Sequence, residues 1–240
     1  MAGRKRVSFI NQCVRMSIVA IHQPQYLPYL GFFHKLNRCD VFIALDDVQF
    51  QKGGLQNRNK IKHQNGWQWI TVPVAHSSDQ LINEVQINTR LAWGRKHWQA
   101  IVTNYTPASH FDTYSDGLQE ILEQDSSDLC SLNMALTAWV MQCLGLEQSV
   151  VLSSDLNVAG TATERLVNLC QAVEADTYLS GPGGRQYMEL SLFDEAGITV
   201  QFQEFEPPVY EQLFPEAGFI PNLSVVDALF CCGPDTVQFL

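Results

Sequence analysis

The sequence predicts an α/β fold, with a mostly parallel, Rossmann-like sheet flanked by helices and a helical insertion in the middle of the chain. Near the start, strand patterns at Ile18 to Ile21 and Val41 to Leu45 enclose a helical pattern at Tyr29 to Cys39. A strand, a helix and a strand within about 30 residues are typical of a βαβ unit, whose right-handed crossover makes the strands parallel. In the middle, apolar residues recur at helical spacing over 91–105, 114–123 and 129–144.

The remaining elements follow in order. A polar loop with Gly53 and Gly54 leads into an alternating stretch with β character from Trp67 to Val74. Later strands are expected at 150–152, 176–179 and 198–202, and later helices at 161–173 and 223–231. No repeat, low-complexity tract or linker interrupts the pattern, so residues 16–240 are expected to form one α/β domain. Residues 1–15 are basic and lack a sustained apolar stretch, which predicts a disordered arm or a mis-assigned start before Met16.

The net charge of −10 is unevenly distributed. Residues 1–75 carry ten Lys+Arg and three Asp, whereas the rest carry five Lys+Arg and 22 acidic residues. The acidic remainder argues against a nucleic-acid partner, while the cations between Lys35 and Lys62 are suited to an anionic group such as a phosphate. No apolar run reaches the roughly 18 residues that span a bilayer, and no secretory signal is recognisable. Seven cysteines without CxxC spacing favour small core residues in a reducing, cytoplasmic compartment over a disulfide framework or zinc site.

The first candidate site follows the first strand. His22 is expected at the carboxyl end of that strand, where open α/β sheets bind their ligands, and the next helix would present its N–H groups to an anion. We take His22 and His34 as candidate catalytic residues, the first stabilising phosphate or developing charge and the second assisting proton transfer. Gln23, Gln25 and Tyr26 are candidate substrate contacts. The alternative is that His22 only caps the strand and that His34 is a satisfied core or surface residue.

Two acids end the second strand. Because adjacent residues of an extended chain point to opposite sides, only one of Asp46 and Asp47 is expected to enter the site. That carboxylate could orient an amine, act as a general base or bind Mg²⁺. Gln49, just beyond, is a further candidate substrate contact. The alternative is a pair of turn-forming aspartates at a strand exit.

A basic group comes next, with Lys52 nearby. Arg58 could grip a phosphate or carboxylate through two hydrogen bonds, with Asn59 beside it and Lys60 acting as a point charge. A solvated basic loop is the alternative interpretation.

A glycine-rich segment at 178–187 could let backbone amides approach phosphate oxygens. Ser180, Gly181 and Tyr187 are its candidate substrate contacts. The segment matches neither GxGxxG nor the Walker pattern, and a tight turn that needs positive φ is the alternative. Near the C-terminus, Ser224 and Asp227 could line the same cleft, although a helix-surface position for Asp227 is an alternative.

At these segments the chain resembles the WbqC-like family. The matching residues are 20–35 (AIHQPQYLPYLGFFHK), 45–50 (LDDVQF), 57–59 (NRN), 71–74 (TVPV), 178–181 (YLSG) and 223–227 (LSVVD). The resemblance implies a role in bacterial polysaccharide or O-antigen biosynthesis, with glycine transfer onto a sugar as the suggested activity. It brings no catalytic residues with it. More loosely, the strand-to-helix turn is similar to that of HxGH-type nucleotidylyl-transfer enzymes and pantothenate-synthetase-like ligases, although His22 and His34 are twelve positions apart.

We therefore expect a transferase or ligase that attaches an aminoacyl group, such as glycyl, to an amino sugar carried by a nucleotide, with ATP and Mg²⁺ as the cofactors to consider. The alternatives are a non-catalytic nucleotide-sugar-binding or assembly protein of the same pathway, a nucleotidylyl-transfer-type enzyme, or a metal-dependent hydrolase using His22, His34 and Asp47. The central expectation is that His22 and the acid pair share one cleft, with Arg58 and Lys60 at its lip.

Overall fold

A five-stranded, all-parallel sheet forms the centre of the protein, in a computed structural model that describes residues 17–77 and 79–240. The arm expected at residues 1–15 lies outside these residues. The spatial order is β7-β2-β1-β8-β9, and every neighbouring pair is parallel. The strands are β1 (Ile18–His22), β2 (Val41–Ala44), β7 (Ser149–Leu152), β8 (Thr177–Ser180) and β9 (Thr199–Phe202). The predicted α/β class with a mostly parallel sheet is confirmed.

The strand order reverses once, between β1 and β8. The chain builds the sheet outward from β1 through β2 to β7, then returns to add β8 and β9 on the other side of β1. In open α/β sheets this reversal leaves a crevice at the carboxyl ends of the two strands, because the crossovers on either side leave in opposite directions. His22 ends β1 and Ser180 ends β8, so both lie at this point.

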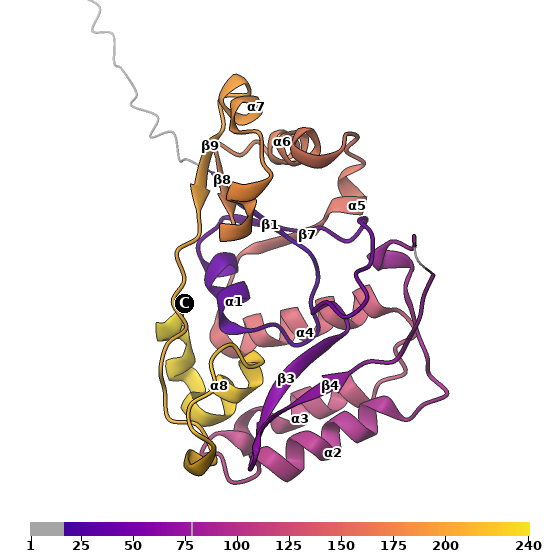
Figure 1. Ribbon diagram of the computed structural model, residues 1–240, viewed down its shortest axis with the longest axis vertical. Coiled ribbons are helices and arrows are strands. Elements are labelled where there is room, and N and C mark those ends of the chain that lie inside the picture. The colour runs from indigo at the N-terminus through magenta and orange to yellow at the C-terminus, as the bar shows by residue number, and fades with distance from the viewer. Residues whose placement is uncertain (1–16, 78) are drawn as a thin grey trace, which may run out of the picture.

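Helices cover both faces of the sheet because successive strand residues point to opposite sides. Val19 and Ile21 pack with residues of α6 (Ala162–Ala172) and α7 (Leu190–Glu195). Ala20 belongs to the larger core, which also holds residues of α1 (Leu30–Asn37) and α8 (Val225–Cys232). Figure 1 shows α6 and α7 at one end of the molecule and α2, α3 and α4 at the opposite end.

The predicted helical insertion lies between β2 and β7. It consists of α2 (Trp93–Tyr105), α3 (Phe111–Glu123) and α4 (Leu129–Leu144), which lie together at the lower end in Figure 1. An antiparallel hairpin of β3 (Arg58–His63) and β4 (Gly66–Thr71) lies beside them. The smaller elements are β5 (Val74–Ala75), β6 (Gln86–Ile87) and α5 (Ser153–Leu156), together with 3₁₀ turns at Ile82–Glu84, Pro182–Gln186, Pro215–Ala217 and Gly233–Phe239.

The structure contradicts the loop interpretation of the basic group and agrees with the interpretation of the cysteines as core residues. The basic group at Arg58 to Lys60 is not a solvated loop but the first half of strand β3. The six cysteines within the described residues are free thiols, of which Cys39, Cys130 and Cys170 are buried, in line with their interpretation as small core residues. Within the same part of the chain, no helix has both the length and the apolar character needed to cross a membrane.

Candidate functional site

A pocket of about 270 Å³ lies at the point where the strand order reverses, and we call it the β1–β8 crevice. Its walls come from the ends of β1 and β8, from α1 and α6, from the residue after β2 and from the turn after β8. The residues that line it are Ile21, His22, Gln23, Lys35, Leu45, Leu166, Tyr178, Ser180, Gly181, Gly183, Gly184 and Tyr187. Its volume is close to the lower end of the range for small-molecule sites, about 300 Å³.

His22 is a neutral imidazole in this crevice. Its Nδ1 lies 3.0 Å from the carbonyl oxygen of Gln23, and because a carbonyl only accepts, Nδ1 carries the hydrogen and Nε2 keeps a lone pair. The ring packs edge-on against Phe32, with centroids 5.1 Å apart. Burial and, to a smaller extent, the charge of Lys35 lower the pKa of His22 to about 3, and the hydrogen bond to Gln23 opposes them only in part.

Lys35 is a buried amine without a carboxylate partner among the described residues. It is 3% exposed, and its Nζ donates to the carbonyl oxygen of Ile21 at 3.2 Å. Burial lowers the pKa of Lys35 to about 7, and nearby Cys39 opposes this shift only in part. No Asp or Glu lines the crevice within the part of the chain that the structure describes. A ligand that supplies negative charge would therefore compensate a cation that the protein itself leaves uncompensated.

The turn after β8 closes the other side of the crevice. Gly184 is required there because an added Cβ would lie 2.3 Å from Oγ of Ser180 and 2.9 Å from Met188. Gly183 faces open space, and a Cβ on Gly181 would lie 3.6 Å from Nζ of Lys35. None of these three glycines has positive φ, so the tight-turn alternative was wrong. The glycines instead leave room close to Lys35.

The acid pair does not line the crevice, although β2 lies beside β1. Asp46 is 1% exposed and accepts hydrogen bonds from the backbone N and the hydroxyl of Ser154, at 3.0 and 2.7 Å. Asp47 forms an ion pair with Arg165 of α6. Leu45, not either aspartate, is the residue after β2 that lines the crevice. The expected shared cleft of His22 and the acids is therefore not formed.

His34 also lies away from His22. Its Nδ1 is 2.9 Å from Nε2 of Gln203, and its ring packs on Phe205 with centroids 5.1 Å apart. Burial, followed by the charge of Arg38, lowers the pKa of His34. It is not among the residues that line the crevice, and its contacts fit the satisfied core residue that was the alternative interpretation.

The basic group stands on the hairpin and not at the lip of the crevice. The Arg58 guanidinium lies 4.3 Å from the ring centroid of Trp69 and donates to the carbonyl oxygen of Gly53. Lys60 Nζ lies 5.1 Å from the ring centroid of Trp67. Asn59 is 1% exposed and donates to the carbonyl oxygen of Leu27 at 2.7 Å, a bond that holds the loop after β1.

The other predicted contacts are divided between the crevice and the core. Gln23, Gln25, Tyr26 and Gln49 were predicted as substrate contacts, and of these four only Gln23 lines the crevice. Its Oε1 accepts a hydrogen bond from Gln56 at 2.8 Å. Gln25 has a buried Oε1 that accepts no bond from the described residues. Tyr26 is fully buried, with its hydroxyl 2.8 Å from Nδ1 of His97. Gln49 is exposed and pairs through its backbone with Leu81. Of the glycine-rich segment, Ser180, Gly181 and Tyr187 all line the crevice.

Ser224 and Asp227 belong to a separate buried network. Ser224 is the N-cap of α8. Asp227 is fully buried, not on a helix surface, and accepts hydrogen bonds from Tyr105 at 2.8 Å, Tyr210 at 2.7 Å and Gln212 at 2.9 Å. Burial raises the pKa of Asp227, and these hydrogen bonds oppose the shift. Both carboxylate oxygens accept hydrogen bonds from protein donors, which is the arrangement of a structural carboxylate.

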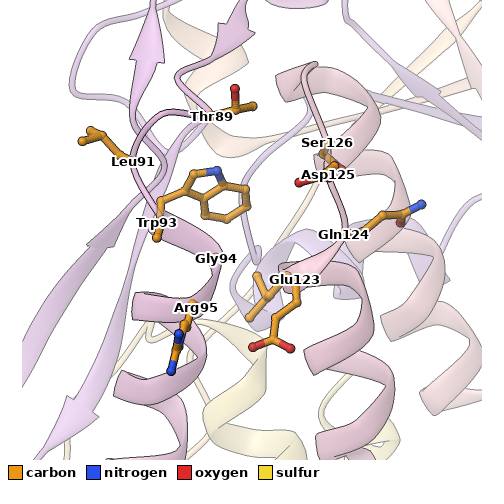
Figure 2. Close-up of a pocket in the computed structure, with 11 residues that line it drawn as sticks. Thr89, Leu91, Trp93, Gly94, Arg95, Glu123, Gln124, Asp125 and Ser126 are labelled. Atoms are coloured by element: carbon orange, nitrogen blue, oxygen red, sulfur yellow. The ribbon is translucent and has the colours of Figure 1, made fainter.

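A second cavity, of about 260 Å³, lies between the start of α2 and the end of α3. Figure 2 shows Trp93 and Arg95 on one side and Glu123 to Ser126 on the other. Gly94 allows this approach, because an added Cβ would lie 1.8 Å from the carbonyl oxygen of Leu122. No predicted site residue lines this cavity. Across residues 17–77 and 79–240, no three His, Cys, Asp or Glu side chains gather closely enough to hold a metal ion.

Lys35 is the main residue that the site predictions missed. The helix that carries it buries every residue from Leu30 to Leu36, so a lysine within it must either find a partner or face a cavity. The sequence offers little signal for this burial: at about 100° per residue, Phe32 and Leu36 lie on one side of Lys35 but Gly31 and Arg38 lie on the other, which places Lys35 at the edge of the apolar face.

The fold is that of a doubly wound α/β protein, with a pocket at the reversal of its strand order. A family model described as the WbqC-like protein family matches residues 23–239, and the chain belongs to this family. It is 38% identical over 229 residues to the uncharacterized protein Rv1507c of Mycobacterium tuberculosis (strain ATCC 25618 / H37Rv), covering 94% of this chain and 98% of that protein. No solved structure gives a significant match.

Proposed function

We propose that this protein is a transferase or ligase that acts on an anionic small molecule bound in the β1–β8 crevice. The observation that carries the proposal is Lys35: a buried amine, without a carboxylate partner in the described chain, in a pocket without acidic lining residues. Buried polar groups aimed at a pocket at the strand-order reversal are the usual features of a ligand site in this class of fold.

The reaction we favour joins an aminoacyl group, such as glycyl, to an amino sugar carried by a nucleotide. The acceptor amine attacks the acyl carbon of an activated donor, and the bond to the donor's leaving group breaks. His22 offers Nε2 as an acceptor that orients the amine, since its Nδ1 hydrogen is committed to Gln23. The Lys35 ammonium would bind a phosphate or the oxyanion that develops on the carbonyl. Asp46, Asp47 and His34 take no part in this scheme.

Ligand binding can be tested by thermal unfolding with UDP-N-acetylglucosamine, a UDP-linked amino sugar, and ATP with Mg²⁺. A ligand present at about 100 times its Kd adds roughly 2.7 kcal/mol to the free energy of unfolding, or about 5–10 °C for a chain of this size. We expect Lys35→Met to abolish the shift and Lys60→Met, a lysine of the hairpin, to retain it. If no nucleotide or sugar nucleotide raises Tm, or if both variants behave alike, the crevice is not the binding site.

Turnover separates the enzyme from a binding protein. Incubation with the UDP-linked amino sugar, glycine and ATP should give a product heavier by one glycyl residue in mass spectrometry. His22→Ala should reduce its formation strongly while keeping the thermal shift. Binding without any product from wild type would favour the non-catalytic alternative.

A nucleotidylyl-transfer reaction is the second candidate, because the strand-order reversal is also where doubly wound sheets bind nucleotides. It predicts that a phosphate oxygen of a sugar phosphate attacks the α-phosphorus of ATP and displaces pyrophosphate, in the absence of any amine acceptor. Pyrophosphate release only when glycine and the amino sugar are both present would instead support the amide-forming reaction.

A further inference from the structure

The exposed face of the β3–β4 hairpin carries an alternating row of cations and indole rings, separate from the crevice. Arg58 pairs with Thr71 and Lys60 with Trp69 across the two strands. Diagonal contacts place Arg58 on Trp69 and Lys60 on Trp67. The two indoles are 43% and 39% exposed, with centroids 5.6 Å apart and planes at 87°. We call these four residues the hairpin ladder: Arg58, Trp69, Lys60 and Trp67.

The opposite face of the hairpin is committed to the core, so the ladder is not a displaced part of it. Ile61 is fully buried and Ile70 is 3% exposed. The ladder ends at Lys62, whose ammonium is buried and donates to Gln212 at 3.0 Å. The two indoles therefore remain exposed to solvent, although burying them would stabilise the fold.

A cavity of about 290 Å³ lies at the Arg58 end of the ladder. Its lining includes Lys52, Arg58, His76 and Asn57, and no described acidic residue contributes to it. Nε of Arg58 is buried and has no hydrogen-bond acceptor among the described residues. A buried guanidinium donor without an acceptor is costly, so this end of the ladder is suited to a ligand that brings a carboxylate or similar anion.

We propose that the hairpin ladder and its cavity bind an acidic oligosaccharide, with a carboxylate at Arg58 and successive sugar rings along the two indoles. Sugar rings present apolar C–H faces that pack on aromatic rings, and their anionic groups pair with the cations between those rings. The alternation of charge and indole matches this chemistry.

The test is isothermal titration calorimetry of the full chain with three hexamers, at 50 and 300 mM NaCl. The probes are a hexasaccharide of alternating glucuronate and N-acetylglucosamine, neutral hexa-N-acetylglucosamine, and the oligonucleotide dT₆. We expect the acidic hexasaccharide to bind at least tenfold tighter than either other probe, with affinity falling at the higher salt concentration. Equal binding of the neutral sugar, equal or tighter binding of dT₆, or no binding of the acidic sugar would overturn the proposal.

Variants locate the site. Arg58→Gln and Trp69→Ala should each weaken the acidic sugar at least tenfold, whereas Trp69→Phe should keep most of the affinity. Lys52→Gln, on an exposed side chain, supplies an independent variant if Arg58→Gln does not fold. Lys96→Gln on α2 is the matched control for charge, and Phe219→Ala, on a ring that is 38% exposed, is the control for an aromatic ring outside the ladder and the crevice. Unchanged affinity in Arg58→Gln, Trp69→Ala and Lys52→Gln, each folded as wild type, would overturn the proposed site. Lys35→Met should bind the sugar with wild-type affinity, so the proposal for the crevice and the proposal for the ladder can be contradicted independently.

Discussion

Asp47 forms an ion pair with Arg165, which lies 118 positions later in the chain, and both side chains are 19% exposed. The pair joins the exit of β2 to α6, just as the contacts of Asp46 join that exit to α5. The acids therefore fasten the second half of the sheet to the first. This accounts for their position beside the β1–β8 crevice, which they do not line.

The Asp47–Arg165 contact should be measurable as a coupling free energy. In a double-mutant cycle with Asp47→Asn and Arg165→Gln, we expect about 1 kcal/mol of coupling in the free energy of unfolding, because the pair is only partly solvated. Urea unfolding of the four proteins gives the value. Asp155→Asn, on an exposed acid of α5, is the control and should show no measurable coupling free energy with Arg165→Gln. Zero coupling for Asp47 would mean that the pair does not hold α6.

Lys35 should make stability depend on pH. Its pKa is about 7 in the folded protein and near the ordinary 10.5 in the unfolded chain, so the unfolded chain binds more protons between these values. The free energy of unfolding of wild type should then rise with pH from 7 towards 10.5, relative to Lys35→Met, by up to about 1.4 kcal/mol per pH unit. Below pH 7 the full cost of the buried ammonium remains and Lys35→Met should be the more stable protein.

Urea unfolding of wild type and Lys35→Met at pH 6.5, 8.0 and 9.5 tests this. An advantage of Lys35→Met that stays constant over this range would show that the amine is not desolvated as described.

The hydrogen bonds to Asp227 should contribute strongly to stability. Tyr210→Phe removes a donor to a buried carboxylate at 2.7 Å, and we expect a loss of about 1.5–3 kcal/mol in the free energy of unfolding. Tyr187→Phe, on an exposed ring, should change it by less than about 0.5 kcal/mol. Chemical denaturation compares the two variants. If Tyr210→Phe lowers the free energy of unfolding no more than Tyr187→Phe does, the hydrogen bond to Asp227 does not stabilise the fold.

Gly94 should not tolerate a methyl group. In Gly94→Ala the new Cβ would lie 1.8 Å from the carbonyl oxygen of Leu122, so α2 and α3 must separate, at about 1–3 kcal/mol or more. Figure 2 shows Gly94 where these helices approach one another. Gly183→Ala has open space around its Cβ and should unfold like wild type. Equal Tm values for the two variants would contradict the close approach.

Local patterns predicted most of the fold because apolar periodicity reflects which residues face the core. Helix α4 was predicted with both ends at Leu129 and Leu144, and all five strands of the sheet were predicted within one or two residues. Strand β3 was missed because Arg58 to His63 contains a single apolar residue, Ile61. Its burial depends on partners distant in sequence, such as Gln212 for Lys62, which no local pattern reveals.

For the site, local patterns predicted only which residues lie at the carboxyl ends of the strands. His22, Ser180 and Gly181 follow from the rule that ligands bind at the carboxyl edge of a parallel sheet, and they do line the crevice. The strand order was not predictable, and it decides that the crevice opens between β1 and β8 and not between β1 and β2. For that reason Asp46 and Asp47 were grouped with His22, while Lys35 was left out.

The pairing of β1 with β8 also sets when the crevice can exist during synthesis. Ser17 and Asp176, at the start of these strands, are joined by a hydrogen bond across 159 positions. A ribosome must therefore make about three-quarters of the chain before the second wall is available, and contacts of such long range form slowly. Until then the ammonium of Lys35 has no glycine turn opposite it. A ligand of the finished crevice therefore cannot stabilise the nascent chain.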